Sequence, residues 1–449
     1  WFKPSWPGQF RPRGVRDRTR QIGHRGRAKM AAIGLSMRCR LPLSSWFGSR
    51  GSASLSGQHG EDSSATSPAG THLKALWTPC KAQRRLVRLK QFLYSLEWPR
   101  QSHLVVDGRS YELPLRPTSD QFGQWSRSDL EYACGFFDGD GCVFVDSGGP
   151  QLLVSQSSSQ AAILFRLRGL FGGGIYWNTH GRGNRRPLVV WKLRGANSVR
   201  AANAMVPFSI TKQPQLLALS DWCDCKSVRA TIRQDLVALK RVPHSASAWH
   251  PSWNYFAGFF DAEGNIYVIS SRYAVRLTVW QKYSPILKGL QLLLNHTWPS
   301  LTCSIIPDRQ GFQLVIGQRE LATHTLRKLL SHGLFVKREL AEVALSVCHS
   351  NHVQARDFMF GVVGNQSRYK RLDAAGCSRA RCISALASKL QARQRVLGSD
   401  VEAVKIELRV KREQHRLAND MHRIGLLRRD IRSLLQQGAK RVFRRGSEQ

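Results

Sequence analysis

The sequence predicts an α+β fold that consists of two copies of one half-domain, followed by a helical C-terminal extension. The first observation is an internal repeat: the segment 132–141, YACGFFDGDG, recurs at 255–264 as YFAGFFDAEG. The second is a shared spacing, because in each copy a lysine follows a glutamine by 56 residues. The third is a shared order of helical and strand patterns, which makes each copy α-β-β-α-β-β-α.

Hydrophobic periodicity places the elements within each copy. The stretch 273–280 alternates, with Val275, Leu277 and Val279 on the face expected to be buried, which is typical of a strand with one solvated face. Patterns of helical period fall between and after the strand pairs, at 159–170, 197–206, 284–295 and 319–332.

Helical patterns also occur on both sides of the duplicated part. Residues 81–96 predict a short amphipathic helix with leucines on one side and arginine and lysine on the other. Residues 380–436 are strongly helical, and they carry a nearly heptad-spaced seam of Leu417, Met421, Ile424, Leu427, Ile431 and Leu434. The seam packs either within a helical hairpin of its own chain or against a helix of a partner.

Composition indicates a polyanionic partner. The 449 residues include 68 Lys and Arg against 30 Asp and Glu, a net charge of +38, while 42% apolar residues suffice for a core. A chain this basic is expected to bind nucleic acid rather than a membrane surface. No run of 18 apolar residues occurs, which excludes a hydrophobic spanning helix. The ten cysteines form no CxxC pair, which favours reduced thiols.

Five segments are expected along the chain. Residues 1–70 form a basic leader without acids between Arg18 and Gly60, resembling an organellar transit peptide, with the mitochondrion favoured over the plastid and Met30 as a plausible start. A basic N-terminal extension follows at 71–127. The repeats occupy 128–243 and 244–350, and a basic helical extension occupies 351–449. The two end regions carry +15 and +13, against +10 for residues 128–350.

The repeated motif predicts a pair of helix ends that carry carboxylates. Small residues four positions apart, Gly135 and Gly139 in the first copy, let two helices approach closely and bring Asp140 and Glu263 side by side. A carboxylate at a helix C-terminus opposes the helix dipole, and two adjacent carboxylates repel. A divalent cation relieves both penalties, and oxygen ligands favour Mg²⁺ or Mn²⁺.

Two other interpretations of the motif fit less well. A calcium-binding loop needs Glu at its twelfth position, where the copies have Gly149 and Arg272. A simple turn would account for one Asp-Gly-Asp-Gly segment, but it does not account for the repeat.

The two motifs resemble the signatures of the double-motif LAGLIDADG homing endonucleases, and the resemblance extends over about residues 128–346. It implies a pseudo-twofold αββαββα duplication in which antiparallel strands form a saddle over double-stranded DNA. It also implies that Asp140 and Glu263 bind the metal, that Gln156 and Gln281 are active-site glutamines, and that Lys212 and Lys337 are active-site lysines. The segment before Lys337 departs from the family pattern, because His332 and Gly333 replace a proline and an aromatic residue.

The outward residues of the predicted strands are the candidates for contacts to bases or phosphates, with a plain solvated face as the alternative. They are Trp177, Lys192, Arg194, Arg276, Thr278 and Gln313.

The sequence therefore predicts a site-specific DNA endonuclease that makes metal-dependent double-strand breaks at a long asymmetric site and has a monomeric core. The lysines would polarise the attacking water or offset charge on the transition state, and the glutamines would order water. The alternative is an RNA-binding protein on the same scaffold, either an intron maturase or a component of an organellar ribosome. The basic end regions motivate that alternative.

Overall fold

The structure is a computed structural model that describes residues 78–117, 124–223, 225–240, 251–269, 274–308, 310–362, 369, 371–394 and 401–442. The expected leader, residues 1–70 with Met30, lies outside the described residues. Within the described residues no helix combines the length and the apolar character that crossing a bilayer requires.

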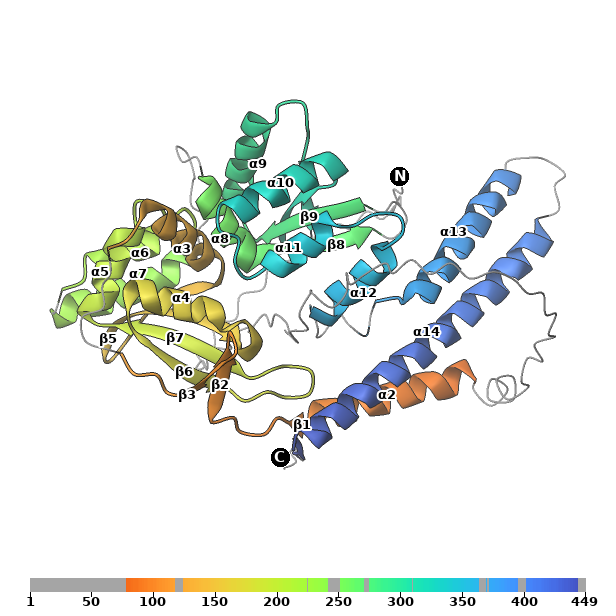
Figure 1. The fold of residues 1–449 in the computed structure, drawn as a ribbon, viewed down its shortest axis with the longest axis horizontal. Helices are drawn as coiled ribbons and strands as arrows, with labels where there is room; N and C mark the ends of the chain where they lie inside the picture. Colours follow the sequence, from red (N-terminus) through yellow and green to blue (C-terminus); the bar gives the residue numbers. More distant parts are fainter. Residues whose placement is uncertain are drawn as a thin grey trace, which may run out of the picture. The chain divides into compact units, whose positions relative to one another are not determined.

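Two four-stranded antiparallel sheets repeat one topology, which confirms the predicted duplication (Figure 1). The first sheet has the order β4-β5-β7-β6, and its strands are β4 (Gly141–Asp146), β5 (Gly149–Ser157), β6 (Gly174–Thr179) and β7 (Leu188–Arg194). The second has the matching order β8-β9-β11-β10, with β8 (Gly264–Ile269), β9 (Ala274–Gln281), β10 (Ser304–Asp308) and β11 (Gly311–Ile316).

Helices pack on one face of each sheet, close to the positions that the sequence predicts. In the first half they are α3 (Arg127–Asp140), α4 (Ala162–Phe171), α5 (Ala196–Met205), α6 (Gln213–Ser220) and α7 (Lys226–Leu239). In the second half they are α8 (Trp253–Glu263), α9 (Pro285–Thr297), α10 (Arg319–Ser331), α11 (Arg338–Leu345) and α12 (His352–Val362). On β9, Val275, Leu277 and Val279 are buried as predicted.

The motif helices α3 and α8 pack against each other, and each also contacts the sheet of its own half. A serine hydroxyl caps the start of each helix: Ser126 accepts from the amide of Asp129 at 3.0 Å, and Ser252 from that of Tyr255 at 3.1 Å. A Cβ on Gly135 would lie 2.9 Å from the amide nitrogen of Phe259 and closer still to the carbonyl oxygen of Tyr255. Glycine at this crossing therefore lets the two backbones touch.

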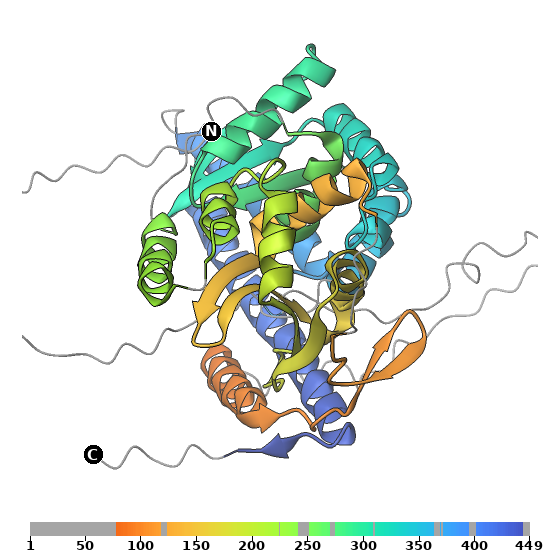
Figure 2. The same ribbon diagram turned by 90° about the vertical axis from the view of Figure 1, so that its left-hand side faces the viewer.

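A second apolar cluster joins the two ends of the described chain. Helix α2 (Pro79–Ser95) packs along α14 (Glu402–Gln436), and the strands β1 (Leu96–Glu97) and β12 (Lys440–Arg441) pair at the end of this module (Figures 1 and 2). The seam residues Ile424, Leu427, Ile431 and Leu434 are buried there. The seam thus packs within its own chain. Helix α14 contacts α13 (Ala374–Gln394), as in a helical hairpin, and it also contacts α2. Met421 is 37% exposed and lies outside the cluster.

A small hairpin, β2 (His103–Val106) with β3 (Arg109–Glu112), links α2 to the first half. Beyond it, Leu115 and Ile175 exchange backbone hydrogen bonds of 2.9 Å at the free edge of β6. The N-terminal extension thereby covers an edge that would otherwise be open to pairing with another chain.

Candidate active site

Asp140 and Glu263 end the two packed helices, so their carboxylates approach each other across the helix pair. A Cβ on Gly139 would lie 3.1 Å from Cγ of Glu263. Burial and the neighbouring charge of Asp140 raise the pKa of Glu263 to about 7. Burial also raises the pKa of Asp140, against the opposing charge of Lys337. These carboxylates are therefore held together at an electrostatic cost.

Each carboxylate receives an amide from the strand beside it. Gln156 has the same strand parity as the buried residues of β5, so it faces α3, and its Nε2 donates to Oδ2 of Asp140 at 2.5 Å. Gln281 takes the equivalent place at the end of β9, where its hydrogen bond lowers the pKa of Glu263. The glutamines thus hold the carboxylates, and their ordering of water stays a prediction.

Lys212 and Lys337 place their ammonium groups on the C-terminal carbonyls of the motif helices. Nζ of Lys212 donates to the carbonyl oxygens of Phe137 at 2.9 Å and Gly139 at 3.1 Å, and also to that of Asp138. Nζ of Lys337 donates to the backbone carbonyl oxygen of Phe260 at 2.9 Å and to that of Asp261. The lysines therefore neutralise the negative helix ends and set a positive charge beside both carboxylates.

Burial lowers the pKa of both lysines, and nearby carboxylates oppose that shift. For Lys212 the opposing charges are those of Asp138, Glu263 and Asp140. The pKa of each lysine thus depends on the carboxylates of both halves. Lys212, Lys337, Asp140 and Glu263 therefore form one electrostatically coupled group.

Two further motif acids hold the lysine segments in place. Asp138 accepts from the backbone amides of Ile210 at 2.6 Å, Thr211 at 2.9 Å and Lys212 at 3.1 Å, and from Oγ of Ser209 at 2.6 Å. A carboxylate that receives several such donors fixes the backbone of the segment.

Asp261 does the same in the second half. It accepts from the amides of Phe335 at 2.6 Å, Val336 at 3.0 Å and Lys337 at 2.7 Å. This places Lys337 in the position equivalent to Lys212, despite the altered residues at 332 and 333. The segment is anchored through its backbone, which tolerates changes of side chain.

Two tyrosines tie these anchors across the helix pair. The hydroxyl of Tyr132 donates to Asp261 at 2.7 Å, and that of Tyr255 donates to Asp138 at 2.6 Å. Burial raises the pKa of both hydroxyls, so they remain donors. Sequence reasoning assigned no role to these acids and tyrosines, although all four recur at equal motif positions and the repeat could have identified them.

No protein-family model matches the sequence, and no curated protein matches it. Solved structures do match. The LAGLIDADG meganuclease I-CpaMI bound to uncleaved DNA is 10% identical over 52% of this chain and 96% of its own, with a TM-score of 0.38. I-SmaMI bound to cleaved DNA is 13% identical over 54% of this chain and 98% of its own, with a TM-score of 0.37. I-LtrWI bound to target DNA is 14% identical over 51% of this chain and 97% of its own, with a TM-score of 0.35.

These structural neighbours are LAGLIDADG homing endonucleases. They belong to the family that the motifs of this sequence resemble, and each is matched over nearly its whole length by about half of this chain.

The LAGLIDADG-like acids fit a divalent cation by their chemistry. Asp140 and Glu263 offer hard oxygen donors that are held together with raised pKa values, which a bound dication would reverse. Within the described residues, no group of three or more His, Cys, Asp or Glu gathers as a metal site. Mg²⁺ commonly completes its coordination with water and substrate oxygens, so two carboxylates can suffice as its acidic ligands.

A cleft of about 230 Å³ lies beside the first motif and is lined from both halves. Lys212, Lys240 and Lys282 contribute cations to its wall, and Gln281 contributes an amide. The clustering of lysines next to the acids suits a phosphate group.

The open faces of the two sheets carry most of the predicted contact residues. Lys192 and Arg194 lie on the face of β7 opposite the core, and Nζ of Lys192 is 5.5 Å from the centre of the Tyr176 ring. Arg276 and Gln313 lie on the equivalent face of the second sheet and are partly exposed.

One predicted contact residue, Trp177, lies on the other face of its sheet, and a second, Thr278, lies on the predicted face but is buried. Trp177 pairs in register with the buried Val189 and packs against the core, so Tyr176 is the aromatic residue on the open face of β6. Thr278 does point to the open face, but it is only 3% exposed because it lies between Asn265 and Val315 on the adjacent strands.

Proposed function

We propose that this chain is a site-specific DNA endonuclease that makes double-strand breaks with the help of a divalent metal ion. The observation that carries the proposal is the duplicated centre: two carboxylates at paired helix ends, each with its own lysine and glutamine. Duplex DNA has two backbone strands of opposite direction. A centre with two equivalent halves suits one phosphodiester on each strand.

Asp140 and Glu263 would hold Mg²⁺ or Mn²⁺, which supplies an activated water and offsets charge on the phosphate. Gln156 fixes the carboxylate of Asp140, so this carboxylate keeps its direction. Lys212 and Lys337 keep positive charge at the helix ends, where negative charge develops on a phosphate that is being cleaved. The anchoring acids Asp138 and Asp261 preserve these positions.

Double-stranded DNA is the proposed partner because basic side chains lie on the open faces of both sheets. Lys192, Arg194 and Arg276 are positioned for phosphates or bases, and the partly exposed amide of Gln313 suits a base edge. Because the contact residues of the two halves differ, the proposed target is asymmetric.

An RNA-binding role on the same scaffold is the second candidate. The observation that favours it is the basic module of α2 and α14, which lies outside the duplicated core; α2 alone carries five lysines and arginines and no acid.

The test is a cleavage selection from a library of randomised duplexes, with Mg²⁺ or with EDTA. The wild type is expected to enrich one family of cut sites in Mg²⁺ only, and Asp140→Asn and Glu263→Gln are expected to enrich none. Glu320→Gln is the matched control, because this acid lies on the surface of α10 with its side chain 68% exposed. Failure of the wild type to cut any duplex, with RNA bound more tightly than DNA, would support the second candidate instead.

A further inference from the structure

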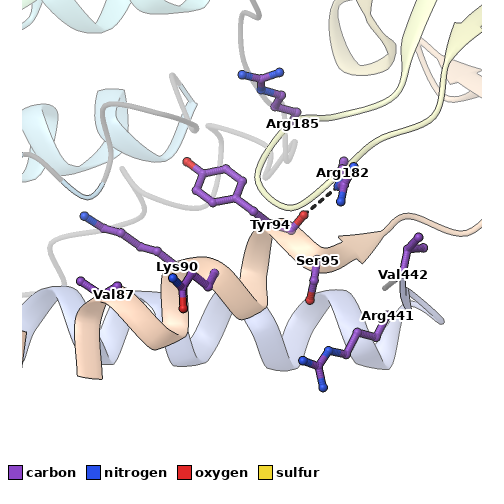
Figure 3. A pocket seen from close by; sticks show the side chains of 9 residues that line it. Val87, Lys90, Tyr94, Ser95, Arg182, Arg185, Arg441 and Val442 are labelled. Atoms are coloured by element: carbon purple, nitrogen blue, oxygen red, sulfur yellow. Dashed lines mark hydrogen bonds between the residues drawn. The ribbon is translucent and has the colours of Figure 1, made fainter. Parts of the chain in front are cut away.

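A second pocket of about 720 Å³ lies outside the motif helices, where three distant segments of the chain meet (Figure 3). One wall is the end of α2, another is the loop between β6 and β7, and the third is β12 with the residue after it. Among the described residues, the lining includes four basic residues, Lys90, Arg182, Arg185 and Arg441, and no acid.

The β6–β7 loop is fixed to the N-terminal extension by a set of backbone contacts. The amide of Trp98 donates to the carbonyl of Gly181 at 2.9 Å, and its indole Nε1 donates to that of Gly183 at 2.8 Å. The amide of Gly183 in turn donates to the carbonyl of Leu96 at 2.7 Å. Gly183 has φ +58, and a Cβ there would lie 2.9 Å from the carbonyl oxygen of Leu93.

The arginines of the loop are held in this setting. Nε of Arg182 donates to the carbonyl of Tyr94 at 2.8 Å, the contact drawn in Figure 3. The backbones of Arg182 and Arg185 pair with each other, at 2.7 and 3.0 Å. Figure 3 shows the side chains of Arg185 and Lys90 on either side of the Tyr94 side chain, and all three residues line the pocket.

The third wall comes from the other end of the chain. After α14 the backbone reverses at Gly438, which has φ +88, and β12 then pairs with β1. The amide of Val442 donates to the carbonyl of Ser95 at 2.8 Å, which sets Arg441 beside α2 with its guanidinium 5.4 Å from the Phe92 ring. Helix α2 and the segment of β12 with Val442 are thus both needed to complete the pocket.

We propose that this pocket binds the phosphodiester backbone of duplex DNA, beyond the stretch that the first sheet covers. Cations from three segments gather around an open cleft, and a phosphate backbone is an extended anion that suits a cleft of this size and charge. The loop that carries two of the cations is the tip of the β6–β7 hairpin, whose strand β7 carries Lys192 and Arg194. The pocket therefore shares a hairpin with the proposed DNA face, and the inference rests on the proposed function for its choice of DNA.

The same geometry predicts a one-sided extension. The pocket is lined by the terminal module and by the β6–β7 loop of the first half, and in the second half Asp308 of the β10–β11 hairpin pairs with Gly311. The two ends of the chain would lengthen the DNA footprint next to the first half only.

The test is equilibrium binding of the full chain to a 40-base-pair duplex of arbitrary sequence, as a function of salt, without Mg²⁺. The double variant Lys90→Gln with Arg185→Gln removes two exposed cations that line the pocket. The control is Lys389→Gln with Lys411→Gln, an equal charge change on exposed positions of α13 and α14. Thermal unfolding shows whether both variants stay folded.

The pocket variant is expected to reduce the salt slope by about 2 and the affinity by roughly tenfold, while the control changes neither. Equal losses in both variants, or no loss in either, would overturn the inference. So would a loss confined to an RNA stem-loop of similar length. A protein that cuts no DNA but shows the pocket-dependent loss on duplex would contradict the proposed function and leave this inference standing.

Discussion

In the two halves of the candidate site, the segments that precede the lysines differ in sequence, but the lysines make the same contacts. Lys212 follows a segment that begins Pro207-Phe208, whereas the segment before Lys337 begins His332-Gly333, with Gly333 at φ +84. Both ammonium groups nonetheless cap a motif helix, and the backbone amides of both segments donate to an aspartate carboxylate. The comparison teaches that backbone amides, rather than the side chains before the lysine, define its place.

The halves also differ in how much of the lysine is covered. Lys337 is 5% exposed, and Lys212 is more open and lines the cleft beside the first motif. The site is thus equivalent in its hydrogen bonds and unequal in its access to solvent.

The largest expected effect comes from the helix crossing. Gly135→Ala and Gly258→Ala each drive a methyl group into the backbone of the opposite helix, so each should cost about 3 kcal/mol or more in unfolding free energy. Gly169→Ala, in the exposed part of α4 with open space around it, should instead gain up to about 1 kcal/mol. Chemical denaturation measures all three; a tolerated Gly258→Ala would break the equivalence of the halves.

The anchoring acids come next. Asp138→Asn and Asp261→Asn turn an acceptor oxygen into an NH₂ group that faces backbone donors. Each substitution should therefore lower the free energy of unfolding by about 2–3 kcal/mol. Equal losses would confirm that both lysine segments depend on their anchor. Asp235→Asn, on the exposed side of α7, is the control and should be neutral. If only one anchor matters, the second lysine is held in another way.

The pH dependence of the metal-free protein tests the paired carboxylates. Folding raises the pKa of Glu263 from 4.5 to about 7, so the folded state keeps a proton that the unfolded chain has released. Stability from this group is therefore present below pH 4.5 and is lost as the pH rises to about 7, by roughly 2–3 kcal/mol. Asp140 acts in the same direction.

Thermal unfolding at pH 5 and pH 8 measures the difference, with Glu263→Gln as the reference. The variant should be more stable than the wild type at pH 8 without metal, and Mg²⁺ should stabilise only the wild type there. The same pH profile in both proteins would mean that the carboxylates do not interact as described.

The smallest effects concern the open faces of the sheets. Arg194→Ala should lower duplex affinity a few-fold and reduce the salt slope by about 1. Trp177→Phe should lower thermal stability and leave DNA affinity unchanged, because this side chain packs against the core. A loss of affinity in Trp177→Phe at unchanged stability would restore the prediction made from the sequence.

Much of the fold could be predicted because the repeat fixes equivalent positions twice. The order of helices and strands, the close helix crossing at Gly135 and the proximity of Asp140 and Glu263 all follow from motif positions and hydrophobic period. The side on which Trp177 lies could not be predicted, since Tyr176 and Trp177 are adjacent aromatics and either fits a buried face.

The contact between the two ends of the chain was also beyond sequence reasoning. The leucines of α2 and the seam of α14 each show an unpartnered apolar face, but periodicity does not say which face meets which. The role of Asp138 was missed for a related reason, because its partners at 209–212 lie about 70 residues away and are mostly backbone amides, which leave no mark in the sequence.

The most direct test of the central claim follows cleavage of each strand of a selected duplex, with one end label per strand, in Mg²⁺ and in EDTA. The account predicts that the wild type and Glu320→Gln cut both strands in Mg²⁺ and neither in EDTA. It predicts that Asp140→Asn, folded and still bound to the duplex, cuts neither strand. Cleavage in EDTA, or undiminished cleavage by Asp140→Asn, would contradict the claim that the paired acids form a metal-dependent nuclease centre.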